Sequence, residues 1–189
     1  VDVLASAFDS AGQRCSALRV LCLQDEIADH TLKMLRGAMA ECRMGNPGRL
    51  TTDIGPVIDS EAKANIERHI QTMRSKGRPV FQAVRENSED AREWQSGTFV
   101  APTLIELDDF AELQKEVFGP VLHVVRYNRN QLPELIEQIN ASGYGLTLGV
   151  HTRIDETIAQ VTGSAHVGNL YVNRNMVGAV VGVQPFGGE

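Results

Sequence analysis

The chain has 189 residues, of which 42% are apolar and 22% charged, and its formal net charge is −6; this composition is typical of a globular domain with room for a sizeable core. No cluster of Lys and Arg offers a nucleic-acid surface, and no apolar run approaches the roughly 18 residues that span a membrane, so neither contact is expected. The three cysteines have no pairing or zinc-ligand spacing, which argues against a disulfide framework and makes a reducing cytoplasm the expected location.

The first predicted elements are a strand and a long helix. The apolar run LRVLCL at residues 18–23 predicts a buried strand. A helix is predicted to run from an N-cap at Asp25 to a stop at Gly45. Its buried face would be formed by the apolar residues at helical spacing: Ile27, Leu32, Leu35, Met39 and Met44.

A loop rich in Pro and Gly leads to a second amphipathic helix. This helix would begin at Asp59 or Ser60 and end before Gly77. Residues 78–84 then predict a strand, and the polar residues 85–97 predict an excursion on the surface.

The second half of the chain continues the alternation. Further strands are predicted at residues 98–107, 119–127, 146–152 and 168–173. Helices are predicted at residues 130–145, where Gly143 ends the pattern, and at residues 155–164, whereas the glycine-rich residues 174–189 predict a loop. Strands that alternate with helices in this way predict βαβ units. We therefore expect one α/β domain over residues 1–189, with a mostly parallel sheet and helices on both faces.

Cys15 stands in the stretch AGQRCSALR, among a glycine, a cation and small side chains. A lone cysteine is more often buried and inert than reactive. Here, however, Gly12 lets the backbone approach a ligand, and the adjacent cation Arg14 favours the thiolate if its charge faces the sulfur. Cys22 lies in an apolar strand and Cys42 near a helix end, so both are interpreted as structural. Cys15 is therefore the candidate nucleophile.

The helpers of such a nucleophile are not evident from the sequence. A cysteine hydrolase or acyltransferase normally needs a base, but none of the five histidines lies close to Cys15 along the chain. The stretch EVFGPVL places Glu116 and Phe118 before a Gly-Pro turn. It fits a plain surface loop as well as a loop that presents a carboxylate and a ring to a ligand. No GxGxxG or GxxxxGK[ST] motif occurs, so the chain has no dinucleotide or phosphate loop of its own.

The motifs GQRC, TDIGPVID, EVFGPVL, GLTLGVHTR, GNLYVNRN and PFGG occur in the order found in the aldehyde dehydrogenase superfamily. The chain resembles this superfamily over nearly its whole length. The stretch GNLYVNRNMVGAVVGVQPFGG and the serine after Cys15 are similar to those of L-glutamate γ-semialdehyde (pyrroline-carboxylate) dehydrogenases. The resemblance extends to the modules of this activity in bacterial bifunctional enzymes of proline catabolism.

The resemblance implies a role for particular residues. Cys15 would be the nucleophile, and its own backbone N–H would help to stabilise an oxyanion. Glu116 would hold the hydroxyls of the nicotinamide ribose of NAD, and Phe118 would pack beside the nicotinamide. The far carboxylate and the aliphatic part of the aldehyde substrate would be held by Ser16, Gly178, Ala179 and Phe186.

Other parts of the family's machinery do not match any part of this sequence. They are the NAD-binding domain, an asparagine that donates to the oxyanion and a glutamate that activates water, all N-terminal to the cysteine, and an oligomerisation segment after PFGG. The chain is therefore expected to be a catalytic domain truncated at both ends and inactive alone. Its partners would be the aldehyde, the rest of a parent chain and further copies in a homo-oligomer, while FAD would belong to a separate proline dehydrogenase domain of the parent.

Three alternatives stay open at this point. The parent could be a dehydrogenase of another aldehyde in the same superfamily. It could also be a cysteine hydrolase or acyltransferase, which would not depend on NAD. Finally, the chain could be a folded segment without any activity of its own.

Overall fold

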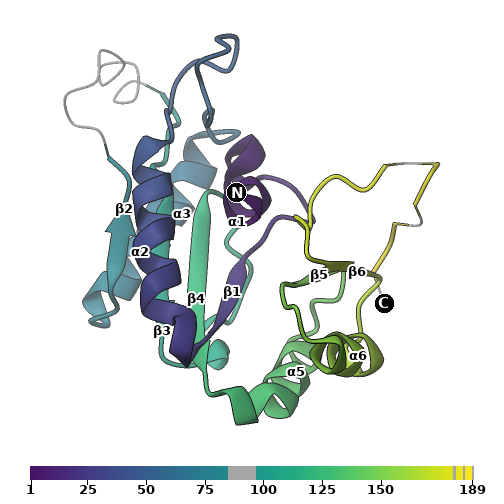
Figure 1. Cartoon of the computed structure of the whole chain (residues 1–189). Coiled ribbons are helices and arrows are strands. Elements are labelled where there is room, and N and C mark those ends of the chain that lie inside the picture. Colours follow the sequence, from purple (N-terminus) through teal and green to yellow (C-terminus); the bar gives the residue numbers. More distant parts are fainter. Residues whose placement is uncertain (85–96, 181, 185, 189) are drawn as a thin grey trace.

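The computed structural model describes residues 1–84, 97–180, 182–184 and 186–188 (Figure 1). Nearly all of the polar excursion predicted at residues 85–97 lies outside the described residues. The larger sheet has the strand order β1-β4-β3-β2, and its strands are β1 (Val20–Gln24), β2 (Val80–Gln82), β3 (Thr103–Leu107) and β4 (Val121–Tyr127).

Strands β1, β4 and β3 run parallel, and β2 pairs antiparallel with β3 at the edge. A separate parallel pair is formed by β5 (Thr147–Val150) and β6 (Asn169–Val172). The predicted mostly parallel arrangement is thus confirmed, although it is divided between two sheets.

The helices surround these sheets in two groups. Figure 1 shows α1, α2 and α3 around the larger sheet, and α5 and α6 beside the β5–β6 pair. Their bounds are α1 (Asp2–Phe8), α2 (Asp25–Glu41), α3 (Ser60–Ser75), α5 (Leu132–Ala141) and α6 (Asp155–Ser164). Short helical turns are η1 (Asp9–Gly12), η2 (Phe110–Glu112) and η3 (Arg129–Gln131).

Both faces of the larger sheet are covered, as predicted. Partners in a parallel ladder point to the same face, so Ile105 and His123 share one face, where His123 contacts His69 of α3. On the opposite face, Glu106 accepts a hydrogen bond from Arg36 of α2. Figure 1 shows α2 in front of the sheet and α3 behind it. The central strands β3 and β4 are therefore buried on both sides.

Helix α2 departs from the prediction at both ends. Its N-cap is Gln24 rather than Asp25, and it ends at Glu41 rather than at Gly45. The carbonyl of Arg43 accepts the N–H groups of two residues in the following loop, so this part of the backbone cannot continue the helix. Met44 consequently leaves the predicted apolar face and bridges to the loop.

The apolar face of α2 was predicted in part. Leu32, Leu35 and Met39 are buried, as expected, whereas Ile27 is exposed. In α3 the predicted cap is confirmed, because Asp59 Oδ1 accepts the N–H of Ala62 at 2.7 Å. The short helix α1 was not predicted at all, since its seven residues are too few to show a helical period.

Candidate functional site

The Cys15 loop, residues 9–19, begins with an unusual turn. Ser10, Ala11 and Gly12 all have positive φ, at 56°, 53° and 66°, in the left-handed region that side chains disfavour. A second turn follows, closed by a hydrogen bond from the Ala17 N–H to the Arg14 carbonyl at 3.1 Å. Cys15 lies at this second turn with its side chain exposed. The chain thus presents the predicted nucleophile to solvent on a tightly wound loop.

The Cys15 loop touches the Glu116 loop, residues 116–119. A Cβ atom added to Gly12 would lie 2.2 Å from the carbonyl oxygen of Gly119, so no larger residue fits there. On its other side, the Cys15 loop is held by Gln13, whose amide accepts the N–H of Ile58 at 2.8 Å and donates to the Pro56 carbonyl at 3.3 Å. Both loops therefore have fixed neighbours.

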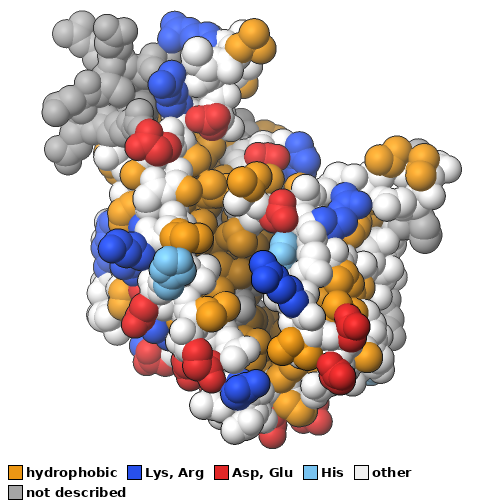
Figure 2. Space-filling view, in the orientation of Figure 1, with side chains coloured by type: hydrophobic (Ala, Val, Ile, Leu, Met, Phe, Trp, Pro, Cys, Tyr) orange, Lys and Arg blue, Asp and Glu red, His pale blue; other side chains and the backbone are white. Residues whose placement is uncertain are grey.

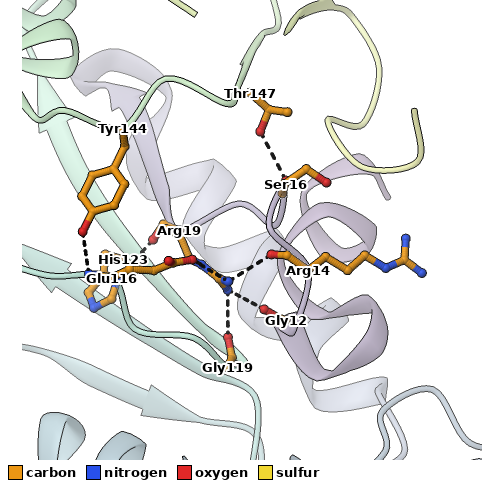
Figure 3. Close-up of polar contacts among 9 residues, drawn as sticks. All are labelled: Gly12, Arg14, Ser16, Arg19, Glu116, Gly119, His123, Tyr144 and Thr147. Atoms are coloured by element: carbon orange, nitrogen blue, oxygen red, sulfur yellow. Dashed lines mark hydrogen bonds and ion pairs between the residues drawn. The ribbon is translucent and has the colours of Figure 1, made fainter. Parts of the chain in front are cut away.

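Arg19 joins the two loops, as Figure 3 shows. Its Nε donates to Glu116 Oε1 at 3.0 Å, and its Nη2 lies 2.9 Å from the same oxygen. The guanidinium carbon lies 4.8 Å from the centre of the Phe118 ring. The same guanidinium donates to the carbonyls of Gly12 at 2.5 Å and Arg14 at 3.1 Å, both in the Cys15 loop.

The charge of Arg19 is enclosed by these partners. Its side chain is 13% exposed, and burial lowers the pKa of Arg19. The hydrogen bond and charge of Glu116 and the charge of Cys15 act in the opposite direction. The sequence-based interpretation assigned the neighbouring cation to Arg14, but the Nε of Arg14 donates to Ser10 Oγ instead. Figure 3 shows the Arg14 side chain pointing away from the Arg19 guanidinium.

Three helpers were missed by sequence reasoning. Arg19 could have been noticed as a cation in an apolar strand, because a buried charge needs partners. The hydroxyl of Tyr144 accepts the Glu116 N–H at 3.0 Å, and the hydroxyl of Thr147 donates to the Ser16 carbonyl at 3.4 Å. Tyr144 lies 28 residues from Glu116, and Thr147 lies 131 residues from Ser16. No local sequence pattern predicts contacts over such separations.

The remaining predicted residues divide into two places. Ser16 is buried in the Cys15 loop, next to the exposed sulfur. The other three lie on the terminal segment, residues 174–188: Gly178, Ala179 and Phe186. Within the described residues, no hydrogen bond joins Ser16 to this segment. The structure therefore brings together Cys15, Ser16, Glu116 and Phe118 on two adjoining loops, and the other three predicted residues lie on the terminal segment.

The terminal segment is attached at its beginning. The N–H of Met176 donates to Ser6 Oγ on α1 at 3.1 Å, and the side chains of Met176 and Val177 are buried. Between this attachment and β1 lies an apolar crevice of about 50 Å³, lined partly by Val3 and Leu21. Figure 2 shows apolar side chains gathered along a hollow in this face of the molecule.

A larger hollow of about 390 Å³ lies on the other side of the Cys15 loop. It is open and of mixed polarity, and Ser10, Gln13 and Asp53 are among its lining residues. Cys15 does not line it. The exposed sulfur of Cys15 therefore lies outside this hollow.

The other thiols and the histidines offer no rival centre. Burial raises the pKa of Cys22 to about 12, and the thiol of Cys42 contacts the Ala38 carbonyl at 3.6 Å. Within the described part of the chain no histidine forms a polar contact with Cys15, and His123 is fully buried. A cysteine–histidine pair of the hydrolase type is therefore not assembled by these residues.

The described residues contain no group of three or more His, Cys, Asp or Glu side chains that could hold a metal ion. No helix in the described ranges is both long and apolar enough to cross a membrane.

Comparisons with known proteins agree with the geometry. The chain is 94% identical over 189 residues to the bifunctional protein PutA of Salmonella typhimurium, of which it covers 14%. It superposes with a TM-score of 0.91 on a crystal structure of bifunctional proline utilization A, at 48% identity, covering all of this chain and 18% of the other.

A second solved structure is a 1-pyrroline-5-carboxylate dehydrogenase from Thermus with bound NAD. It matches with a TM-score of 0.85 at 35% identity, and the match covers all of this chain and 35% of that one. The chain thus spans only part of the length of the proteins it matches. The family model for the aldehyde dehydrogenase family matches residues 2–189, and the chain therefore belongs to the aldehyde dehydrogenase family.

Proposed function

We propose that the chain carries the nucleophile of an NAD-dependent enzyme that oxidises L-glutamate γ-semialdehyde to L-glutamate in proline catabolism. The observation that carries the proposal is the exposed Cys15, held by Arg19 against the loop of Glu116 and Phe118. The 94% identity to a PutA protein and the match to a pyrroline-carboxylate dehydrogenase support this choice of substrate.

The residues of the Glu116 loop fit the nicotinamide end of NAD. The Glu116 side chain is 37% exposed, so its carboxylate can accept hydrogen bonds from ribose hydroxyls in addition to those from Arg19. The Phe118 ring is 45% exposed and has Arg19 against one face, which leaves the other face for a planar ring. Residues outside these 189 would hold the phosphates, because this chain has no phosphate loop.

Cys15 performs the covalent part of the proposed reaction. Its thiolate forms a bond to the aldehyde carbon, and the carbonyl oxygen becomes an oxyanion. No acceptor among the described residues takes the Cys15 backbone N–H, so this donor is available to the oxyanion. Bound NAD would supply the hydride acceptor for this carbon, with its nicotinamide end held by Glu116 and Phe118. A thioester on Cys15 remains, and water cleaves it to release the acid and restore the thiol.

The proposed aldehyde differs from simple aldehydes in having a second carboxylate, far from the reacting carbon. Ser16 directly follows the nucleophile, so a donor on Ser16 lies within a few bonds of the reacting sulfur. The N–H groups of Gly178 and Ala179 would complete the anchor, and Phe186, which is 47% exposed, would cover the methylene groups. A dehydrogenase for an aldehyde without a second carboxylate would not need this anchor.

The proposal extends to the parent protein. The rest of the parent chain would supply the NAD-binding domain, the asparagine donor and the water-activating glutamate. A separate proline dehydrogenase domain would carry FAD, and the parent would form a homo-oligomer. The 189 residues alone are expected to show no steady turnover, since the loss of one oxyanion donor typically slows such reactions by about 10²–10³.

The experiment uses an intact protein that contains this chain. NAD⁺ reduction is followed with glutamate γ-semialdehyde and, separately, with an unbranched alkyl aldehyde. We expect turnover that Cys15→Ala abolishes and that Cys42→Ala, the matched thiol control, retains. Equal efficiency with both aldehydes would instead favour another aldehyde as the substrate. Ester hydrolysis without NAD⁺ as the main activity would identify a hydrolase, and turnover in Cys15→Ala would contradict the assigned nucleophile.

A further inference from the structure

Every nitrogen of the Arg19 guanidinium has an acceptor in this chain. Nε bonds the Glu116 carboxylate, Nη2 bonds the same carboxylate and the Arg14 carbonyl, and Nη1 bonds the carbonyls of Gly12 and, at 3.4 Å, Gly119. The acceptors on Gly12 and Arg14 belong to the Cys15 loop, and those on Glu116 and Gly119 belong to the Glu116 loop. One planar guanidinium thus bonds both loops and fixes the distance between them.

A lysine could not make this arrangement. Its ammonium is a single point charge, whereas a guanidinium spreads its N–H groups over a rigid plane. The carboxylate lies at one edge of the Arg19 plane and the carbonyls at the others (Figure 3). The Phe118 ring packs against the guanidinium as well. The shape of the contact therefore demands arginine, and the charge alone would not satisfy it.

The backbone of Arg19 is bonded by His123, which in turn contacts His69. The Arg19 carbonyl accepts the His123 backbone N–H at 2.9 Å and lies 3.1 Å from His123 Nδ1. His123 Nε2 lies 2.8 Å from His69 Nε2. These contacts are all satisfied when His123 carries its proton on Nδ1 and accepts at Nε2 from His69. Both ends of the arginine are thus anchored.

We propose that Arg19 is a positioning residue that sets where Cys15 lies relative to Glu116 and Phe118. It acts by binding both loops at once, and it keeps a positive charge near the Cys15 sulfur and the Glu116 carboxylate. The part of the proposal that concerns NAD rests on the proposed function. The part that concerns the geometry and reactivity of Cys15 does not.

The first test measures Cys15 alone, in the intact protein without NAD⁺ or aldehyde. The variants are Arg19→Met, which removes the charge and the fork, and Arg19→Lys, which keeps the charge. Alkylation of Cys15 by iodoacetamide is followed by peptide mapping. We expect a lower rate in Arg19→Met and a smaller decrease in Arg19→Lys, because the loop that presents the sulfur loses its contacts with the guanidinium. The matched control is Arg126→Met, which removes an arginine that links β4 to α2 and should leave the rate unchanged.

The second test separates cofactor from substrate. In both Arg19 variants the KM for NAD⁺ should rise by about ten- to a hundredfold, because a charge-assisted contact that orients Glu116 is lost. The KM for the aldehyde should change by less than about twofold. In a Glu116→Gln background, Arg19→Met should add little further increase in the KM for NAD⁺, since Arg19 would act through that carboxylate.

The outcomes distinguish the two proposals. If the intact protein does not oxidise the aldehyde, the proposed function fails, and the alkylation rates still decide the role of Arg19. If it oxidises the aldehyde but Arg19→Met retains both the alkylation rate and the KM for NAD⁺, the role of Arg19 is overturned. If Arg19→Met does not fold, Arg19→Lys decides: a KM for NAD⁺ equal to that of Arg126→Met contradicts the proposal.

Discussion

The two regions that carry the predicted site residues are held by the chain in different ways. The Cys15 and Glu116 loops touch at Gly12 and Gly119, and Arg19 bonds both. The terminal segment is bonded through Met176 to Ser6, and near its end Gly187 packs closely against Gly168. Beyond Met176, Val177 is buried, whereas three other apolar side chains are exposed: Val180, Val183 and Phe186.

This difference matches what each region would do. Covalent attack and hydride transfer depend on the spacing between the nucleophile and the cofactor, so rigid support there contributes directly to the rate. A carboxylate anchor needs only N–H and O–H donors that can close around an anion. The close contact between the Cys15 and Glu116 loops is therefore suited to preorganising the reacting groups.

The largest expected effect is the difference in reactivity between Cys15, in the Cys15 loop, and Cys22, in β1. Cys15 is exposed, while burial raises the pKa of Cys22 to about 12. At pH 7.5 the thiolate of Cys22 should therefore be suppressed by about four orders of magnitude. Iodoacetamide labelling of the folded protein, followed by peptide mapping, should modify Cys15 at least about a thousandfold faster than Cys22. Comparable labelling of the two thiols would show that the loop and the strand are equally accessible.

A matched pair of glycine substitutions tests the comparison directly. In Gly12→Ala the added Cβ would meet backbone oxygen at 2.2 Å, whereas in Gly178→Ala it would meet nothing within 4 Å. Both sites have positive φ, so Gly178→Ala should cost only the backbone strain, about 1–2 kcal/mol. Gly12→Ala adds a clash and should cost about 3 kcal/mol or more.

The measurement for this pair is the urea concentration at which the half-buried Cys22 thiol becomes reactive in the intact protein. Gly12→Ala should lower it strongly and Gly178→Ala only slightly. Equal decreases in this urea concentration for the two variants would mean that the surroundings of Gly12 are no more tightly packed than those of Gly178.

Ser16→Ala tests whether the Cys15 loop helps the terminal segment to bind the far carboxylate of the substrate. Only glutamate γ-semialdehyde has a far carboxylate for Ser16 to bind, so its affinity should fall about ten- to a hundredfold, the value of one charge-assisted hydrogen bond. The affinity for an unbranched alkyl aldehyde should barely change. KM values for both aldehydes, measured on the intact protein, provide the comparison, and parallel losses would show that Ser16 does not read the carboxylate.

The smallest effect concerns acid and the support beneath Arg19. Burial, with a smaller contribution from His69, lowers the pKa of His123 from 6.5 to about 4. His123 therefore binds a proton more tightly in the unfolded chain than in the folded one. The free energy of unfolding is highest above pH 6.5 and decreases as the pH falls toward 4. Between pH 7.5 and pH 5 the loss should be about 2 kcal/mol.

Hydrogen exchange, corrected for its intrinsic pH dependence, can locate this loss. Protection in β4 should fall between pH 7.5 and pH 5, while protection in β6 should change little. His123→Asn, whose amide can still donate to the Arg19 carbonyl, should remove the pH dependence in β4, and His30→Asn, at an exposed position, should not. Equal losses in β4 and β6 would assign the acid sensitivity to another group.

The sequence predicted the larger elements because their signals are local. Alternating apolar and amphipathic stretches predicted the α/β fold, and Asp59 was correctly expected as a cap of α3 because a cap bonds only the next turn. The predicted end of α2 was wrong, since Arg43 and Gly45 pair with residues 53 and 54 instead of continuing the helix. That pairing crosses a loop, which a helical period does not contain.

The candidate site shows the same division. Motifs in order were sufficient to suggest Cys15, Glu116 and Phe118, and the comparisons show the family to which these motifs belong. The partner of Cys15 was assigned to its neighbour Arg14, because adjacency is the only proximity that a sequence displays. The folded chain instead brings Arg19 into contact with Glu116, 97 residues away.

By itself, therefore, the sequence determined the order of strands and helices, the family and a candidate nucleophile, all of which depend on residue type and short-range spacing. Only the tertiary structure decided which cation lies near that nucleophile, how closely Gly12 approaches Gly119, and that His123 supports Arg19 from below. The physical reason is that these contacts are made between loops that meet only when β1 and β4 pair side by side. The parallel pair of β1 and β4 joins segments about 100 residues apart through backbone hydrogen bonds. Every residue type has a backbone that can form such bonds, so the sequence does not show which strands pair.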